Sequence, residues 1–299
     1  MKVGHRLRRE IPLYLMILPP LALLVIYNYG PMLGLVMAFQ RFNPALGFLK
    51  SPWVGLYYFQ RMMILPDVGR VIGNTLYIAT LKIVFDTVAA VVVAILLADI
   101  RSARFKKTVQ TIIYYPYFLS WVILGGIFKD FLAVDGLVNR FLGLFGVAPI
   151  RFLSTAPLFP WILVSTEVWQ ITGFGTILFL AAILGINPQL YEAASLDGAG
   201  WLRRTWHVTL PGMRTTIVVM LLISLGSILN AGFDQILNLY STSVYSTGDV
   251  IDTWVYRAGI QQAQYSLAAA VGLFRSVVSF VLIAVGYYFA YKKADYRVF

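Results

Sequence analysis

The chain has 299 residues, of which 59% are hydrophobic and 12% are charged, and its formal net charge is +11. Soluble globular domains carry about 25% charged residues, so this composition excludes a protein that is solvated by water over most of its surface. The absence of cysteine excludes disulfide frameworks, thiol nucleophiles and metal sites with cysteine ligands.

Six segments are long and apolar enough to cross a bilayer, which takes about 20 residues in a helix. The first is expected to be broken at Pro19-Pro20 and at Gly30-Pro31. Its basic start resembles a signal peptide, but the apolar run is too long and no small-residue cleavage site follows, so we expect a retained helix. The sequence therefore predicts a single all-α transmembrane domain over residues 1–299, with helices near residues 13–39, 71–98, 109–132, 158–184, 213–231 and 267–291.

The basic residues form short clusters between apolar runs rather than one patch with interleaved aromatic residues, which argues against nucleic-acid binding. The two histidines, His5 and His207, are far apart in the chain, so no histidine metal site is expected. Lysine and arginine are more numerous on one side of the predicted spans, which places both termini and the loop 185–212 in the cytoplasm. The basic residues on that side are Lys2, Arg6, Arg8, Arg9, Arg101, Arg104, Lys106, Lys107, Arg203, Arg204, Arg214, Lys292, Lys293 and Arg297.

Two segments outside the spans are predicted to be helical. On the exterior side, apolar residues at 250, 251, 254 and 255 share one helical face, which predicts a short amphipathic helix at the outer surface. On the cytoplasmic side, residues 187–211 read as helix, turn and helix. Asn187 suits the N-cap and Pro188 the first helical position. Gly198 suits a helix end in the left-handed conformation, and Pro211 is expected to open the fifth span.

This cytoplasmic loop resembles the coupling loop of ABC importer permeases. The matching positions are Glu192, Ala193, Ala194, Asp197, Gly198, Ala199, Leu210 and Pro211. The resemblance implies the type I permease fold, in which this loop forms a coupling helix that docks in a groove of the ATPase, with Glu192 facing basic residues there. Thr205 departs from the pattern, since an aromatic residue usually stands at that position, and Trp206 beside it can supply apolar surface.

Further segments resemble the polysaccharide and complex-oligosaccharide branch of these permeases, which includes an alginate importer permease. They are residues 73–76, 167–174, 233–240 and 264–274. The resemblance implies import of an oligosaccharide through a path of which this chain forms half. It also implies the partners, which are a second homologous permease, two cytoplasmic ATPase subunits and an extracytoplasmic solute-binding protein, within membrane lipid. The chain has no Gly-Lys dipeptide and no phosphate-binding loop, so ATP and magnesium are expected on the ATPase subunits, with no cofactor here.

Ionisable residues within the spans are costly in a bilayer and are functional candidates. Lys82 and Asp86 are four residues apart and can neutralise one another as a structural pair, with a substrate role as the alternative. Arg275 is expected to pair with Glu167 or with Asp86. The remaining candidates offer the acceptors, donors and aromatic faces that a sugar path requires, or else hydrogen bonds between helices; they are Glu167, Trp169, Gln170, Asn230 and Asp234.

Three alternative functions are compatible with a chain of apolar helices. Within the same family, the solute can be a peptide, an amino acid or phosphate. A secondary transporter or channel would show repeated spans with broken helices in corresponding positions, and none is found. A polytopic membrane enzyme would need a cluster of His, Asp or Glu at one membrane face, and the acidic pair Asp130 and Asp135 is too sparse for this.

Overall fold

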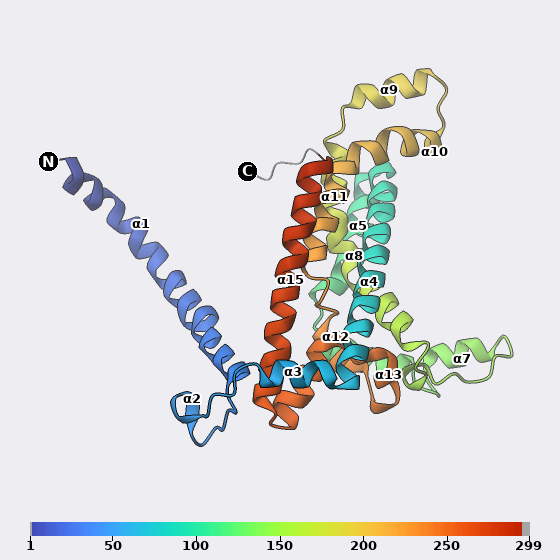
Figure 1. The fold of residues 1–299 in the computed structure, drawn as a ribbon. Coiled ribbons are helices and arrows are strands. Elements are labelled where there is room, and N and C mark those ends of the chain that lie inside the picture. The colour runs from blue at the N-terminus through green and yellow to red at the C-terminus, as the bar shows by residue number, and fades with distance from the viewer. Residues whose placement is uncertain (1, 295–299) are drawn as a thin grey trace. The chain divides into compact units, whose positions relative to one another are not determined.

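The computed structural model describes residues 2–294, with the side chains of residues 10–288, and the described chain is built of helices (Figure 1). The basic residues expected at the two termini (Lys2, Arg6, Arg8, Arg9, Lys292, Lys293 and Arg297) lie outside the described side chains. No β-strand occurs between residues 2 and 294; one isolated antiparallel bridge joins Gln40 and Trp53. The α-helices are α1 (Lys2–Leu24), α2 (Gly47–Lys50), α3 (Tyr57–Ile64), α4 (Pro66–Asp99), α5 (Ala103–Tyr114), α6 (Trp121–Phe131), α7 (Leu137–Gly143), α8 (Phe159–Leu184), α9 (Pro188–Leu196), α10 (Trp201–Arg204), α11 (Leu210–Gly226), α12 (Phe233–Leu239), α13 (Tyr245–Gly248), α14 (Ile251–Tyr256) and α15 (Tyr265–Ala294).

Shorter π and 3-10 segments connect or extend several of these helices. They are η1 (Val25–Tyr29), η2 (Gly30–Phe39), η3 (Tyr115–Phe118), η4 (Phe152–Ser154), η5 (Thr205–Thr209), η6 (Thr242–Val244) and η7 (Arg257–Gln261).

Five helices in the described part of the chain are long and apolar enough to cross a membrane. They are Glu10–Phe39, Pro66–Asp99, Phe159–Leu184, Trp201–Gly226 and Tyr265–Tyr288. A sixth span is reached if the bent pair Ala103–Phe118 and Trp121–Phe131 crosses as one unit. The prediction of an all-α membrane protein is confirmed.

The third predicted span, 109–132, is not one straight helix, because its two halves meet at an angle of 101°. Leu119 is extended at the break, and the Ser120 side chain caps α6 by accepting a hydrogen bond from Ile123 N at 3.4 Å. Pro116 lies in the turn η3 before the break and has no N–H with which to continue a helix. Pro116 and the Ser120 cap are the sequence signals for this break. A prediction from length and hydropathy does not use them.

The first span is continuous where a break was predicted. The helix runs through Pro12, Pro19 and Pro20 and changes to π and then 3-10 geometry around Gly30, without a turn. A proline is tolerated within a membrane helix when local π and 3-10 adjustments re-satisfy the freed backbone groups.

The fifth span was predicted over 213–231, and the structure places it over Trp201–Gly226. The helix therefore begins before Pro211 rather than at it. The π turn η5 explains the earlier start. Leu210 N donates to Thr205 O five residues back, so the backbone hydrogen bonds change from the α to the π pattern just before the proline.

The chain divides into two compact units, and the larger comprises Pro66–Trp254 and Arg275–Phe299. In this unit α4 packs along α8. Thr176 Oγ1 donates to Ala90 O at 3.5 Å, so small residues allow these two helices to approach closely. Two apolar clusters lie at different levels of this pair. The first contains Ile78, Ala79, Phe159, Leu163, Ala231, Ile236, Leu239, Val244 and Val250, and the second contains Ala90, Val91, Ala94, Leu97, Phe179, Leu180, Ile183 and Met213.

The segment 250–257, predicted as an amphipathic helix on the outer surface, contains α14, but the helix is buried. Ile251 and Trp254 are only 2% and 7% exposed. Ile251 N donates to Thr75 Oγ1 at 2.9 Å, and Asn74 Nδ2 donates to Asp249 O at 3.1 Å. These bonds draw the start of α14 against α4, which the periodicity of the segment alone did not reveal.

The smaller unit comprises Met1–Leu65 and Val255–Phe274. Within it, Phe42 N donates to Ser266 Oγ at 2.9 Å, and the rings of Phe42 and Tyr265 are perpendicular with centroids 6.1 Å apart. No residue in the most apolar window of Glu10–Phe39 is buried within the chain, so this helix offers its surface to lipid or to another subunit.

Candidate functional site

The loop 187–211 has the local geometry that its sequence predicts. Asn187 caps α9, because its Oδ1 accepts a hydrogen bond from Gln189 N at 3.0 Å, and Pro188 is the first residue of the helix. At the other end, Gly198 is left-handed with φ +70°, and Ala199 N donates to Ala194 O at 2.9 Å. The glycine is needed here because a side chain at this φ is strained.

Two side-chain contacts fix α9 to the start of the fifth span. The hydroxyls of Tyr191 and Thr209 lie 3.1 Å apart, and Arg204 Nη1 donates to Ser195 Oγ at 3.2 Å. These contacts connect α9 directly to α10 and η5, which precede α11. The sequence prediction did not include Tyr191 or Arg204 in this role.

The outer face of the loop is exposed. Glu192, Ala193, Asp197 and Gly198 are all exposed, and Leu196 at the end of α9 is 90% exposed. Ala194 and Ala199 are half-buried, and Leu210 packs on the second apolar cluster, while Pro211 is exposed at the start of α11. The outer face of the loop is therefore open to solvent within this chain.

A cavity of about 430 Å³ lies beneath the loop. Its lining includes Asp99 at the end of α4, Leu184 at the end of α8, and Tyr191, Glu192 and Arg204 from the loop. Glu192 thus stands at the rim of a hollow between the loop and the helix ends, rather than within a packed core.

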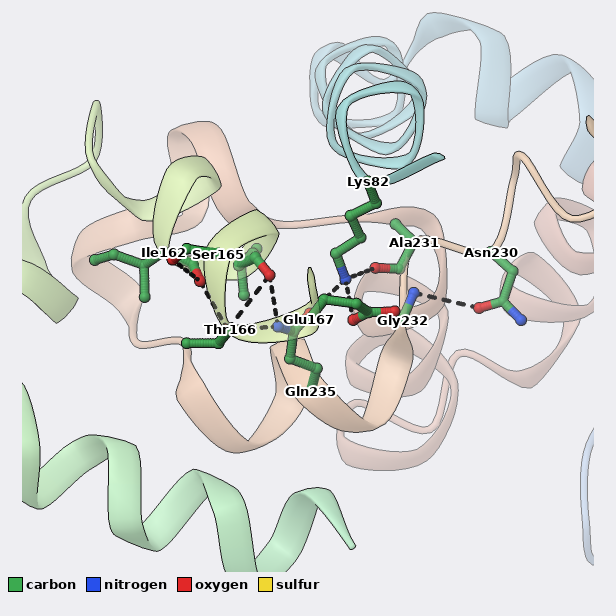
Figure 2. A network of polar contacts seen from close by, with 10 residues as sticks. Lys82, Ile162, Ser165, Thr166, Glu167, Asn230, Ala231, Gly232 and Gln235 are labelled. Atoms are coloured by element: carbon green, nitrogen blue, oxygen red, sulfur yellow. Dashed lines mark hydrogen bonds and ion pairs between the residues drawn. The ribbon is translucent and has the colours of Figure 1, made fainter. Parts of the chain in front are cut away.

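The second site is a polar network inside the helix bundle, shown in Figure 2, in which Lys82 reaches from α4 toward α8 and the segment before α12. Lys82 Nζ donates to Glu167 Oε2 at 2.7 Å, to Ala231 O at 2.7 Å and to Gln235 Oε1. An ammonium group has three donors, and all three are used. The Lys82 and Glu167 side chains are 6% and 18% exposed, so the ion pair is largely buried.

Gln235 completes the network from α12. Its amide nitrogen donates to Leu163 O at 2.7 Å and to Thr166 Oγ1 at 2.8 Å, while its oxygen accepts from Lys82. Gly232 stands beside this group with φ +90°, and a Cβ there would lie 2.7 Å from Lys82 Nζ. The network therefore requires a glycine at position 232.

Two predicted pairings within the spans are wrong. Lys82 pairs with Glu167 on another helix rather than with Asp86, because its long side chain extends across to α8 and α12; Asp86 Oδ1 is buried without a hydrogen-bond partner. Arg275 pairs with Asp252 on α14 rather than with Glu167 or Asp86. Burial raises the pKa of the Asp252 carboxyl, and the Arg275 guanidinium partly opposes that rise.

The remaining predicted path residues are in different environments. Gln170 is 6% exposed and donates to Leu119 O at 3.0 Å, so it secures the break between η3 and α6. Trp169 is 50% exposed and its ring contacts Phe128 edge to face, with centroids 5.6 Å apart. Asn230 and Asp234 are exposed, and Asn230 Oδ1 accepts from Gly232 N at 3.3 Å.

The sequence of the chain matches a known family over residues 90–294, described as "Binding-protein-dependent transport system inner membrane component". Members of this family are transport components rather than enzymes. Among the described residues, no group of three His, Asp or Glu side chains is placed to hold a metal ion.

Two curated relatives come from Bacillus subtilis (strain 168). The chain is 44% identical over 290 residues to "Protein LplB", which covers 97% of this chain and 91% of that protein. It is 40% identical over 288 residues to the "Polygalacturonan/rhamnogalacturonan transport system permease protein YteP", which covers 96% of this chain and 90% of that protein.

A solved structure supports the same relationship. A chain of a bacterial ABC transporter involved in the import of the acidic polysaccharide alginate is 36% identical in sequence and superposes with a TM-score of 0.89, covering 98% of this chain and 99% of that chain. The protein is a multi-pass membrane protein. It belongs to the family of inner membrane components of binding-protein-dependent transport systems.

Proposed function

We propose that this chain is the permease subunit of an ATP-driven, binding-protein-dependent importer and that it forms half of the translocation path for an oligosaccharide. The observation that carries the proposal is the match to the alginate importer chain over 98% of this chain at a TM-score of 0.89. Because the match covers 99% of the alginate importer chain, nearly all the helices of that chain have counterparts here.

The substrate class rests on the named relatives. YteP is a permease of a polygalacturonan and rhamnogalacturonan transport system, and a second solved structure has the alginate transporter in complex with an alginate pentasaccharide-bound periplasmic protein. Galacturonate and alginate units carry carboxylates, so the named substrates share acidic sugars. We favour an oligosaccharide over a peptide, amino acid or phosphate on this ground.

The coupling element is α9 with its following turn. We assign the ATPase-coupling role to Glu192, Ala193, Ala194, Asp197, Gly198, Ala199, Leu210 and Pro211. In this proposal the ATPase moves α9, and the Tyr191–Thr209 and Arg204–Ser195 contacts carry that movement into the fifth span. Glu192 is exposed and available to meet a basic groove.

The proposal includes the other subunits. A second homologous permease supplies the other half of the path, two cytoplasmic ATPase subunits bind and hydrolyse ATP with magnesium, and an extracytoplasmic solute-binding protein delivers the substrate. No cofactor is assigned to this chain. The distribution of lysine and arginine supports a topology with both termini and the loop 185–212 in the cytoplasm.

We place the sugar path beside the exposed polar and aromatic side chains Trp169, Asn230 and Asp234. Glu167 and Gln170, also candidates from the sequence, are engaged with Lys82 and with Leu119 O respectively, and we assign them a positioning role. The three exposed residues offer a ring face, an amide and a carboxylate to sugar hydroxyls.

The test is transport by the reconstituted complex. Proteoliposomes holding both permeases and the ATPase subunits should take up a labelled oligosaccharide only when ATP is inside and the binding protein is outside. Omission of either permease should abolish uptake. Uptake of amino acids or peptides, with no uptake of any oligosaccharide, would overturn the substrate class, and uptake by this chain alone would overturn the importer itself.

A further inference from the structure

A small pocket in the smaller compact unit has the groups that recognise an acidic sugar. It has a volume of about 270 Å³ and lies between α3 and the segment that opens α15. Its lining includes Phe42, Tyr58, Arg61, Gln264 and Tyr265. Pockets for drug-sized ligands measure about 300–1,000 Å³, so this one suits a single sugar unit rather than a whole oligosaccharide.

The cationic group of the pocket is Arg61, in the last turn of α3. Among residues 10–288, whose side chains are described, no carboxylate forms an ion pair with it. A guanidinium presents its donors in a planar fork that matches a carboxylate, so an unpaired arginine at a pocket wall favours an anionic ligand. Tyr58 is three residues before Arg61, so both side chains project from one face of α3.

The opposite wall supplies aromatic and amide groups. The rings of Phe42 and Tyr265 pack edge to face, with centroids 6.1 Å apart, and Ser266 Oγ fixes Phe42 by accepting its backbone N–H at 2.9 Å. Aromatic faces pack against the apolar face of a pyranose ring, and an amide such as that of Gln264 can both donate to and accept from sugar hydroxyls.

The backbone of this wall is strained. Ala263, which also lines the pocket, has φ +54°, the one positive φ at a non-glycine residue between residues 2 and 294. The conformation is held because Gln264 N donates to Ala258 O at 2.8 Å and Gln262 N donates to Arg257 O at 3.0 Å. A strained backbone residue such as Ala263 is often found at binding sites, where it fixes the direction of the side chain next to it. Here the next side chain is that of Gln264.

We propose that the pocket formed by Phe42, Tyr58, Arg61, Gln264 and Tyr265 binds one hexuronate unit of an acidic oligosaccharide, with Arg61 on its carboxylate and the aromatic rings on its pyranose face. The inference rests on the proposed function, since it names the chemical class of the transported sugar. In the topology proposed above, the pocket lies on the extracytoplasmic side.

The experiment uses the complete importer complex in nanodiscs, without the binding protein, and measures equilibrium binding of labelled trigalacturonate. Its fully methyl-esterified form is the neutral comparison ligand. Arg61→Gln should weaken binding of trigalacturonate about tenfold, which corresponds to about 1.4 kcal/mol, and should leave binding of the ester unchanged. Arg61→Lys should lie between the two, because it keeps the charge and loses the fork.

Arg41→Gln is the matched control, because Arg41 is an exposed arginine of the same compact unit outside the pocket lining. It should bind both ligands as the wild type does. Tyr265→Leu should weaken binding of both ligands, since the ring acts on the sugar face. Thermal unfolding of each variant confirms that the fold is retained.

Several results would overturn the inference. The inference is wrong if the wild type and Arg61→Gln bind trigalacturonate equally well. It is also wrong if the wild type does not bind trigalacturonate. An equal loss of uptake for neutral and acidic sugars in Arg61→Gln, with weaker docking of the binding protein, would instead identify Arg61 as a protein contact. Uptake of neutral oligosaccharides alone would contradict the inference and leave the proposed function intact, whereas no uptake of any oligosaccharide would contradict the proposed function.

Discussion

Lys82 Nζ lies 2.7 Å from Glu167 Oε2, and the two residues are 85 positions apart in the chain. The pair joins α4 to α8, and the same ammonium group also binds Ala231 O ahead of α12. One buried cation therefore holds three segments together. The contacts saturate the ammonium group, so Lys82 has no donor left for a substrate.

Removal of one member of this pair should destabilise the complex more than removal of both. Lys82→Met leaves the Glu167 carboxylate without its partner, and loss of one partner of a buried ion pair costs roughly 3–5 kcal/mol. The double variant Lys82→Met with Glu167→Gln removes the unpaired charge and should recover part of that loss. Thermal unfolding of the purified complex in detergent measures both. Single variants as stable as the wild type would show that the ion pair does not hold the three segments together.

Gly232→Ala should destabilise the same network from the backbone side. Residue 232 has φ +90°, and the added Cβ would lie 2.7 Å from Lys82 Nζ, which three hydrogen bonds hold in place. The expected loss is roughly 1–3 kcal/mol from backbone strain, with a further loss from displacement of Lys82. Gly47→Ala is the control, because residue 47 has φ +67° and open space around the new Cβ. Equal melting temperatures for the two alanine variants would contradict a specific role for Gly232 in the network.

The Asp252–Arg275 pair predicts a pH dependence of stability. Burial raises the pKa of Asp252 above its usual value of 3.8, with Arg275 opposing. As the pH rises above 3.8, the unfolded chain loses this proton first, so the folded state binds more protons until its own raised pKa is passed. Stability from this group is therefore present at low pH and declines as the pH rises through that window.

Asp252→Asn should abolish this decline, because asparagine does not titrate. The measurement is the unfolding temperature of the purified complex over a pH series that begins near 3.8. Asp67→Asn, at an exposed carboxylate that pairs with Arg70, is the control and should keep the wild-type slope. The same slope in Asp252→Asn as in the wild type would assign the pH dependence to other groups.

Local signals in the sequence predicted the geometry of the loop 187–211 well. The Asn187 cap, the Pro188 start and the left-handed Gly198 are all confirmed, because each depends on only a few neighbouring residues. Apolar length located the spans only approximately, since the fifth begins at Trp201 rather than at residue 213. The break at Leu119 was missed because hydropathy is insensitive to the angle between two apolar halves.

Partners within the bundle could not be read from the sequence. Lys82 and Asp86 share a helical face, yet the lysine side chain is long enough to reach Glu167 on α8, and the packing of α4 against α8 decides between them. The sequence does not indicate Asp252 as the partner of Arg275, because Asp252 belongs to a short helix whose burial depends on hydrogen bonds to Asn74 and Thr75. Contacts of this kind arise from tertiary packing.

Glu192→Lys tests the coupling role of α9. Glu192 is exposed on the loop, and the family resemblance implies a basic groove opposite it, so a lysine would place like charges at the contact. We expect substrate-stimulated ATP hydrolysis and oligosaccharide uptake by the reconstituted complex to fall together. Both activities should fall less in Glu192→Gln, because this change removes the attraction without adding repulsion. Membrane insertion and binding-protein docking should be unchanged.

Gln189→Lys is the matched control, because it adds a cation to an exposed position of the same helix while Glu192 remains.

Gly198→Val addresses the turn, where a β-branched residue at φ +70° costs on the order of 1–3 kcal/mol. It should lower ATP hydrolysis and uptake together, as Glu192→Lys does, since it displaces the α9 surface that the ATPase is proposed to meet. If Glu192→Lys and Gly198→Val both hydrolyse ATP and transport at wild-type rates, the loop is not the coupling element. If hydrolysis persists while uptake alone is lost, the loop transmits motion without being the ATPase dock, because docking is required for stimulation and transmission only for transport.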